Sequence, residues 1–410
     1  MSRASALAPF SVRSFRFQWP ADLATSWAFE MEALILGWYI LSTTGSVQQL
    51  VAFGALAWLG SLFSPFFGVA GDRIGQRTLL CLTRGIYAML AALLSVLALT
   101  GALVPWHVFA ISAVAGLLRP SDMVMRHALV AQTMRAEVLL GALAISRTTS
   151  DTARVAGALA GTGLVAFMGM GAAYVVVAGM YVAAFLLSLG VAGHQPSGKP
   201  DPHPVAGLKQ AVGYVWTRPE LLGPFSLAFL VNLLAYPFVL GLLPFVAKEV
   251  YAIGQAGLGQ LAAAFWAGAL AGSLAVGANR LPLRAGRTML VFGVLWFGLV
   301  LVFGQVQVVA VGMVVLFLTG FVQSFCLTPL AAVMLRASEE DMRGRVMGMR
   351  MLAIWGLPLG LLAAGPLIAW IGFAATTLLY ASLGIAATVA TGWRWRAALW
   401  QPGAPANARV

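Results

Sequence analysis

The chain consists of long apolar runs, separated by short connections that carry most of its charged residues. Residues 48–67 contain no charged residue, and the run from Leu79 to Trp106 contains only Arg84. Each run is long enough to cross the hydrocarbon of a bilayer as a helix, which needs roughly 20 residues. Only 9% of the 410 residues are charged, and the mean hydropathy is +0.89. A water-soluble fold is therefore excluded.

The apolar segments lie near 18–43, 48–70, 78–99, 104–125, 138–166, 169–192, 222–247, 256–278, 288–304, 307–335, 346–369 and 371–392. They predict an all-α polytopic membrane protein with about twelve transmembrane helices. Basic residues gather in every second connection, as with Arg73 and Arg77 and then Arg126 and Arg135. By the positive-inside rule, both termini are expected in the cytoplasm.

The only long polar stretch covers residues 193–219, where several prolines are followed by apolar residues at helical spacing. It predicts a cytoplasmic linker with a short amphipathic helix at the membrane surface. The expected organisation is a six-helix half at 1–192, this linker, a second six-helix half at 220–395 and a cytoplasmic tail at 396–410. The two halves are expected to be pseudo-symmetric, because two residue pairs recur at a similar offset: Asp72 with Asn279, and Arg135 with Arg343.

Other classes of protein fit the sequence less well. The net charge of +12 could suit nucleic acid, but the basic residues lie in short loops rather than on one face. Cys81 and Cys326 lie in apolar runs and predict no disulfide, and the four histidines lack the spacing of a metal site. We find no motif for a nucleophile or a phosphate-binding loop. The sequence therefore predicts neither an enzyme nor a bound cofactor, and no nucleic-acid partner.

Residues 68–77 read Gly-Val-Ala-Gly-Asp-Arg-Ile-Gly-Gln-Arg and are expected to form a tight charged loop at a membrane surface. The loop resembles the signature between the second and third helices of the major facilitator superfamily of transporters, Gly-x-x-x-Asp-Arg-x-Gly-x-Arg. The matching residues are Gly68, Asp72, Arg73, Gly75 and Arg77. The resemblance implies two halves that bind substrate near the midplane between them, and an inner gate at this loop. Family analogy also places a fourth-span carboxylate against the loop, so Asp122 with Arg77 is the expected gate pair, one turn from Arg119.

Further stretches resemble one branch of the superfamily, which contains the enterobactin exporter and macrolide efflux proteins. They are Gly37-Trp38-Tyr39, Thr44-Gly45-Ser46, Arg154-Val-Ala-Gly157, the loop with Arg343, Gly344 and Arg345, and Pro358-Leu-Gly360. The resemblance implies structural or conformational roles for Arg154, Gly157, Arg343, Gly344 and Arg345. It also implies a proton-coupled exporter of a small amphipathic molecule, a siderophore or a drug, that works as a monomer in the cell inner membrane. Exporters usually have proline where Ala158 stands, so an importer on the same fold remains open.

The first span contains three carboxylates, Asp22, Glu30 and Glu32, and ionised groups inside a membrane are rare unless they have a function. Glu30 and Glu32 lie close to the midplane and point about 200° apart around a helix, so they cannot face the same cavity. Asp22, Ser26 and Glu30 form the better polar stripe. Burial favours the protonated form of a carboxyl, so such a group can exchange protons near neutral pH.

The alternative for these carboxylates is a structural ion pair, for example with Arg147 or Arg119. Arg147, Asp151 and Arg154 share one face of the fifth span, at i, i+4 and i+7. Asp151 can neutralise only one arginine at a time, which leaves a positive charge that suits an anionic ligand or Glu30. Arg154 alternatively joins the fifth helix to its neighbours. The expected partners are a small-molecule substrate, protons and the lipid bilayer.

Overall fold

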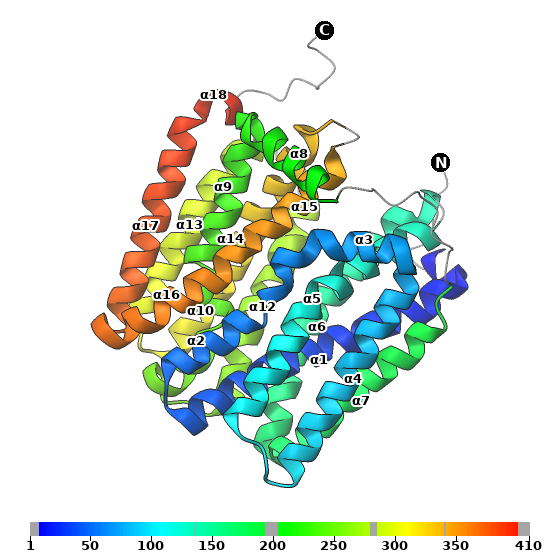
Figure 1. Ribbon diagram of the computed structural model, residues 1–410. Helices are drawn as coiled ribbons and strands as arrows, with labels where there is room; N and C mark the ends of the chain where they lie inside the picture. Colours follow the sequence, from blue (N-terminus) through cyan, green and yellow to red (C-terminus); the bar gives the residue numbers. More distant parts are fainter. Residues whose placement is uncertain (1–7, 135, 193–203, 279–284, 340–341, 401–410) are drawn as a thin grey trace.

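The structure is a computed structural model that describes residues 8–134, 136–192, 204–278, 285–339 and 342–400. All regular structure in these residues is helical, and no strand is found there. Figure 1 shows the helices packed side by side in a bundle, with α8 and α18 at the same end. We refer to this end of the bundle as the α8 end.

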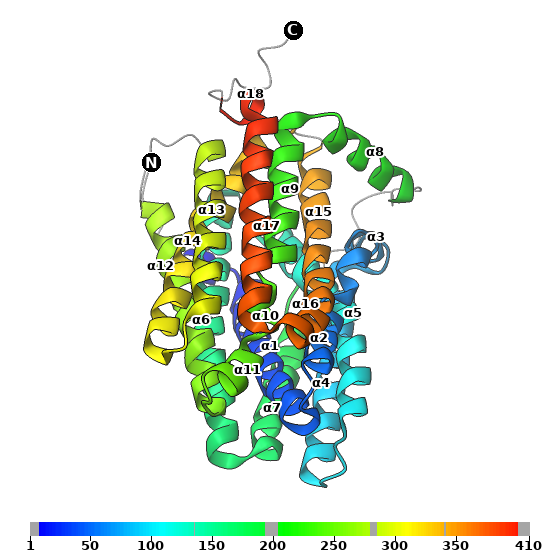
Figure 2. The same cartoon turned by 90° about the vertical axis from the view of Figure 1, so that its left-hand side faces the viewer.

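The first half of the chain forms seven helices and two short 3-10 turns, at Ala8–Ser11 and Leu59–Phe63. The helices are α1 (Arg13–Thr44), α2 (Val47–Leu56), α3 (Ser64–Ile74), α4 (Gln76–Leu99), α5 (Pro105–Thr133), α6 (Ala136–Met168) and α7 (Met170–Leu189). The predicted amphipathic segment forms α8 (Pro204–Trp216), which lies across the end of the bundle in Figure 2. The rest of the expected linker, residues 193–203, lies outside the described residues.

The second half begins with α9 (Pro219–Leu234), the short α10 (Pro237–Leu240) and α11 (Leu243–Phe245), and a π-helical turn at Val246–Val250. It continues with α12 (Gln255–Ala278), α13 (Ala285–Gln305), α14 (Val309–Arg336), α15 (Arg343–Leu352), a 3-10 turn at Ala353–Trp355, α16 (Gly356–Ile371), α17 (Phe373–Arg394) and α18 (Arg396–Leu399).

Eight helices of the described chain are long and apolar enough to cross a membrane, with α15 and α16 counted as one. The other four expected spans coincide with α1, with α2 to α3, with α6 and with α9 to Val250. Two of these spans are broken where the sequence predicted continuous helices. One break comes after Leu234, where Pro237 and then Pro244 follow. Proline interrupts a helix there because it has no N–H to donate. The predicted fold class, an all-α polytopic bundle, is confirmed.

The charged segment 68–77 is helical for most of its length, which corrects the expected loop. Helix α3 continues to Ile74, and only Gly75, with φ +90°, turns the chain into α4. A side chain would be strained at this φ, so the glycine is required. Gly45, with φ +64°, ends α1 in the same way. The Ser46 hydroxyl then accepts a hydrogen bond from the Gln49 N–H (3.3 Å) and caps α2.

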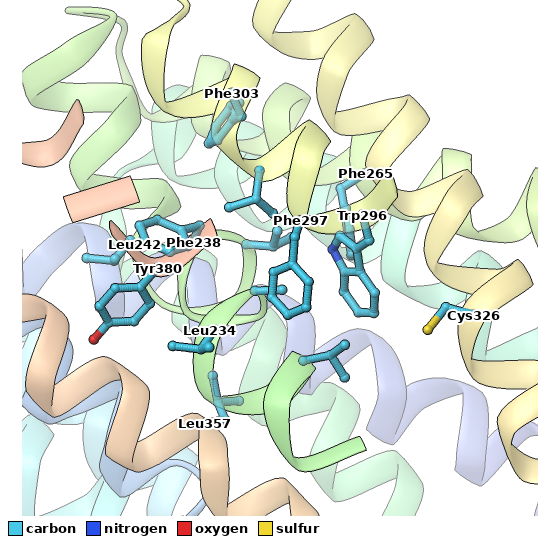
Figure 3. Packing of buried hydrophobic residues seen from close by; sticks show 14 of the residues in the cluster. Leu234, Phe238, Leu242, Phe265, Trp296, Phe297, Phe303, Cys326, Leu357 and Tyr380 are labelled. Atoms are coloured by element: carbon cyan, nitrogen blue, oxygen red, sulfur yellow. The ribbon is translucent and has the colours of Figure 1, made fainter. Parts of the chain in front are cut away.

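The buried apolar side chains form separate clusters in the two halves. The largest is built mainly from helices α9 to α17, and Figure 3 shows its Phe238 ring beside that of Tyr380, with centroids 5.4 Å apart. A second cluster lies among α1, α4, α5 and α7 and includes Tyr87, Tyr174 and Tyr181. Helix α6 packs on α12 and α2 packs on α16, and these contacts join the two halves.

Helix α6 approaches α1 closely because it presents glycines there. A Cβ atom at Gly161 would lie 2.7 Å from the Met31 Cα, and one at Gly157 would lie 3.0 Å from the Glu30 Cβ. Small residues allow helix backbones to meet in membranes, where packing rather than the hydrophobic effect drives association. The close contact brings the polar face of α6 against the carboxylate face of α1.

We expect Gly161→Ala to destabilise the protein by about 1–3 kcal/mol, the usual effect of overpacking a close contact. Gly163→Ala is the matched control, because a Cβ at Gly163 has open space around it. Thermal unfolding of the purified protein in detergent measures both variants. Equal melting temperatures for the two would show that the α1–α6 contact does not depend on Gly161.

Candidate functional site

One buried ion network is centred on Arg84 of α4, whose side chain is 0% exposed. Its Nη2 contacts Asp22 Oδ1 of α1 at 2.5 Å, and its Nε contacts Asp122 Oδ1 of α5 at 2.9 Å. Its Nη1 donates a hydrogen bond to the Ser188 hydroxyl of α7 at 2.7 Å. A single guanidinium therefore ties four helices of the first half together. In the sequence, Arg84 is the single charge of a long apolar run, and no pattern there indicates its partners.

The expected gate pair of Asp122 and Arg77 does not form in this structure. Arg77 donates from Nη2 to the Leu189 carbonyl at 2.5 Å, and Asp122 is held by Arg84. Arg84 lies on the same face of α4 as Arg77 but about two turns, roughly 10 Å, further along the helix. Arg84 is therefore at the depth of Asp122, and Arg77 remains at the helix start.

The remaining gate candidates are dispersed. Arg73 is exposed near the end of α3, and Gly75 makes the turn. The side chain of Asp72 and the surroundings of Gly68 lie outside the described part of the structure. Arg119 is near the middle of α5, where its guanidinium stacks on Phe29 and Trp58 at 4.9 and 4.4 Å from the ring centroids. Arg119 thus belongs to the middle of the bundle rather than to an end.

A second ion network lies near the middle of α1 and α6. Glu30 Oε1 is 3.5 Å from Arg154 Nε, so its ion-pair partner is Arg154 rather than the expected Arg147 or Arg119. Asp151 contacts Arg147 at 3.1 Å and Arg154 at 3.8 Å, as their spacing on one helix face predicts. The Arg147 side chain is 67% exposed, and that of Glu30 is 16% exposed. This network is more open to solvent than the one around Arg84.

Arg154 also reaches the second half of the chain. Its guanidinium lies 4.4 Å from the ring centroid of Trp266 on α12, a cation–π contact. Glu30, the partner of Arg154, lies close to Trp266 as well. Glu30, Arg154 and Trp266 thus connect α1, α6 and α12, across the interface where the halves meet.

Glu32 points away from this interface, as the helical period predicts. It accepts hydrogen bonds from the hydroxyls of Tyr174 and Tyr181 on α7, both at 2.7 Å. The expected polar stripe of α1 does not face one cavity. Asp22 contacts Arg84 of α4, Ser26 accepts a hydrogen bond from Arg126 of α5 at 3.1 Å, and Glu30 meets Arg154 of α6.

Two further arginines carry positive charge between the halves. Arg350 is partly buried in α15, in the neighbourhood of Tyr236, Arg147 and Cys326. Among the residues that the structure describes, neither Arg350 nor Arg119 forms an ion pair with a carboxylate. By contrast, Arg345 is exposed and donates to Gln210 Oε1 of α8 at 2.5 Å, which joins α15 to α8. Arg343 is exposed beside Arg345, and the surroundings of Gly344 lie outside the described part of the structure.

The comparison with protein families identifies the class. A sequence model described as Major Facilitator Superfamily matches residues 19–282. The match covers more than half of the chain, which therefore belongs to the major facilitator superfamily of transporters. The resemblance of segment 68–77 is thus confirmed at the level of the superfamily. Among curated proteins, no sequence match was found.

Solved structures show the same fold. A POT family transporter in complex with 5-aminolevulinic acid aligns with a TM-score of 0.74, 11% identity, and coverage of 94% of this chain and 97% of that one. The nucleoside transporter NupG aligns with a TM-score of 0.72 and 12% identity, over 95% of this chain and 100% of that one. A bacterial homologue of the human lysosomal transporter Spinster, in an inward-facing and unoccupied conformation, aligns with a TM-score of 0.72 and 13% identity. The alignment covers 95% of this chain and 98% of that one. At these identities the likeness concerns the fold alone.

We expect Arg84→Gln to destabilise the protein by about 3–5 kcal/mol, because it leaves two buried carboxylates without their cation. Adding Asp22→Asn and Asp122→Asn in the same chain removes those charges and is expected to restore much of the loss. Arg73→Gln, at an exposed position, is the control and is expected to melt like the wild type. A wild-type melting temperature for Arg84→Gln alone would contradict a structural role for the network.

Proposed function

We propose that the chain is a proton-coupled exporter of a small amphipathic molecule, a siderophore or a drug, that works by alternating access. The motif pair at residues 68–77 and 342–348 supports export through its resemblance to the enterobactin exporter and macrolide efflux proteins. The alternating basic connections support a location in the cell inner membrane with both termini in the cytoplasm. One chain contains both halves, so we propose that it acts as a monomer, without a cofactor and without enzymatic activity.

The observation that carries the proposal is the contact of Glu30 and Arg154 with Trp266. Protonation of Glu30 removes the negative charge that neutralises Arg154, and thereby changes a network that spans the two halves. A proton can bias the conformational equilibrium only if it binds one state better than the other. A carboxylate whose partner also contacts the opposite half meets that condition, since rocking of the halves alters its surroundings.

The other candidate residues take supporting roles in this proposal. Arg147 and Asp151 line the same interface and contribute to the substrate cavity. Arg73, Gly75, Arg77 and the acidic Asp72 form the inner gate, where α3 contacts α15 and α8 at the α8 end. Asp22 and Asp122, held by Arg84, stabilise the first half.

We expect Glu30→Gln to reduce proton-driven export to background while downhill exchange remains. Glutamine keeps the size of the side chain and mimics a permanently protonated carboxyl, so the ligand site survives and the titration is lost. Inside-out vesicles with a preformed pH gradient serve as the assay. A pH-sensitive dye reports the loss of the gradient when enterobactin or the macrolide erythromycin is added.

Glu32→Gln is the matched control, because Glu32 lies between two tyrosines of the same half. It is expected to retain coupled export. If Glu30→Gln supports full uphill transport, the coupling group lies elsewhere and this role of Glu30 is refuted. Retained coupling in both variants would direct attention to Asp22 and Asp151.

One observation favours a second candidate, the import of an anionic solute by proton symport. Arg119 and Arg350 have no carboxylate partner among the described residues, so the interface carries more positive than negative charge. Protonation of Glu30 would raise this positive charge further and strengthen the binding of an anion. By linkage, the anion would then strengthen proton binding by the same factor.

The sign of the proton exchange on ligand binding distinguishes the two candidates. An antiporter in which proton and ligand compete releases protons when the ligand binds, and a symporter takes them up. The measurement is the pH change of a weakly buffered solution of purified protein on addition of a transported compound. For the exporter we expect acidification that disappears in Glu30→Gln, and alkalinisation would support the importer.

A further inference from the structure

A surface groove runs along the boundary of α4 and α7, on the outside of the first half and away from the networks above. Its volume is about 540 Å³, and it is lined by Arg77, Thr78, Cys81, Leu82, Gly85, Ile86, Met89, Phe185 and Leu189. Apart from Arg77 and Thr78, the lining is apolar. Leu82 and Met89 are 56% and 64% exposed. The α4–α7 groove, as we name it, is therefore an open apolar surface.

The groove lies at the depth of the hydrocarbon. Its walls belong to Gln76–Leu99 and Met170–Leu189, two of the helices that are long and apolar enough to span a membrane. In a bilayer, a surface of this kind on the outside of a bundle is in contact with acyl chains unless another protein covers it. Gly85 keeps the groove open, because a side chain there would fill the space beside Phe185, whose ring is 3.3 Å from the position of a Cβ.

Arg77 closes one end of the groove at the membrane boundary. It is the second residue of α4, and its Nη2 is occupied by the Leu189 carbonyl. Among the described residues, the Arg77 side chain forms no ion pair and makes no other hydrogen bond. An unpaired cation at this place is suited to an anionic group that arrives from the membrane surface.

The length of the groove matches one lipid chain. From Arg77 to Met89, α4 rises about 18 Å at 1.5 Å per residue. Half of a bilayer's hydrocarbon thickness is about 15 Å. A phosphate at Arg77 would therefore place an acyl chain along Cys81, Ile86 and Met89 and end it near the midplane.

We propose that the α4–α7 groove binds one anionic phospholipid, with its phosphate at Arg77 and one acyl chain in the groove. The Arg77 guanidinium supplies the charge-assisted hydrogen bond, and the apolar lining supplies the contact with the chain. A zwitterionic lipid of the same chain length fills the groove but gains less from Arg77, because its headgroup has no net charge. The proposal does not depend on export, on import or on proton coupling.

The test is photo-crosslinking of the full-length purified protein in nanodiscs. Phosphatidylglycerol or phosphatidylcholine, each with the same diazirine-bearing acyl chain, is included at a low fraction among unlabelled lipids. We expect phosphatidylglycerol to label peptides containing residues 78–89 and 185–189 about fivefold more than phosphatidylcholine, as follows from about 1 kcal/mol per arginine near an anionic headgroup. Arg77→Gln is expected to remove this preference.

Arg73→Gln is the control, because it removes an exposed arginine of the same segment without touching the groove. It is expected to keep the preference. Equal labelling by the two lipids in the wild type overturns the proposal, as does a preference that Arg73→Gln and Arg77→Gln reduce alike. The comparison of the two lipids on the wild-type protein tests the proposal even if Arg77→Gln fails to fold.

Discussion

The organisation of the first half depends on the high free energy of an ionised side chain in hydrocarbon. Arg84 is fully buried and is compatible with the fold only because Asp22 and Asp122 approach it from two other helices. Helix α1 supplies a carboxylate to α4 at Asp22 and another to α6 at Glu30, while Glu32 is satisfied by two tyrosines of α7. The rotation and depth of α1 are therefore fixed by three independent polar contacts.

The helices of the two halves are held together by different kinds of contact. The first half contains several ionised groups that are paired between helices, and α12 to α17 contain no aspartate or glutamate. These later helices pack through apolar side chains and close glycine contacts, as where Gly272 of α12 meets α14. Charge from the first half reaches the second at the interface, where Arg154 stacks on Trp266. The buried carboxylates of the described helices are consequently concentrated in the first half.

The two ion networks differ in exposure, and the roles that we propose for them follow this difference. The Arg84 network is sealed within one half, and its geometry has no reason to change when the halves move. The Glu30 network is partly exposed and includes a residue of the other half. Under the proposed rocking of the halves, motion of α12 against α6 would alter this network. The same pair of groups, a carboxylate facing an arginine, is thus proposed to be structural in one place and to couple protons in the other.

The sequence by itself determined the features that depend on local regularity. Apolar length and basic connections identified a helical membrane bundle. The 3.6-residue period separated Glu30 from Glu32 and paired Arg147 with Asp151. Only the tertiary structure decided that Arg84 rather than Arg77 meets Asp122, that Arg154 meets Glu30, and that Arg350 lies between the halves. The partner of a charge on another helix depends on the relative depth and rotation of both helices. Those are set by side-chain packing, as at Gly161 against Met31, and no spacing within one helix specifies them.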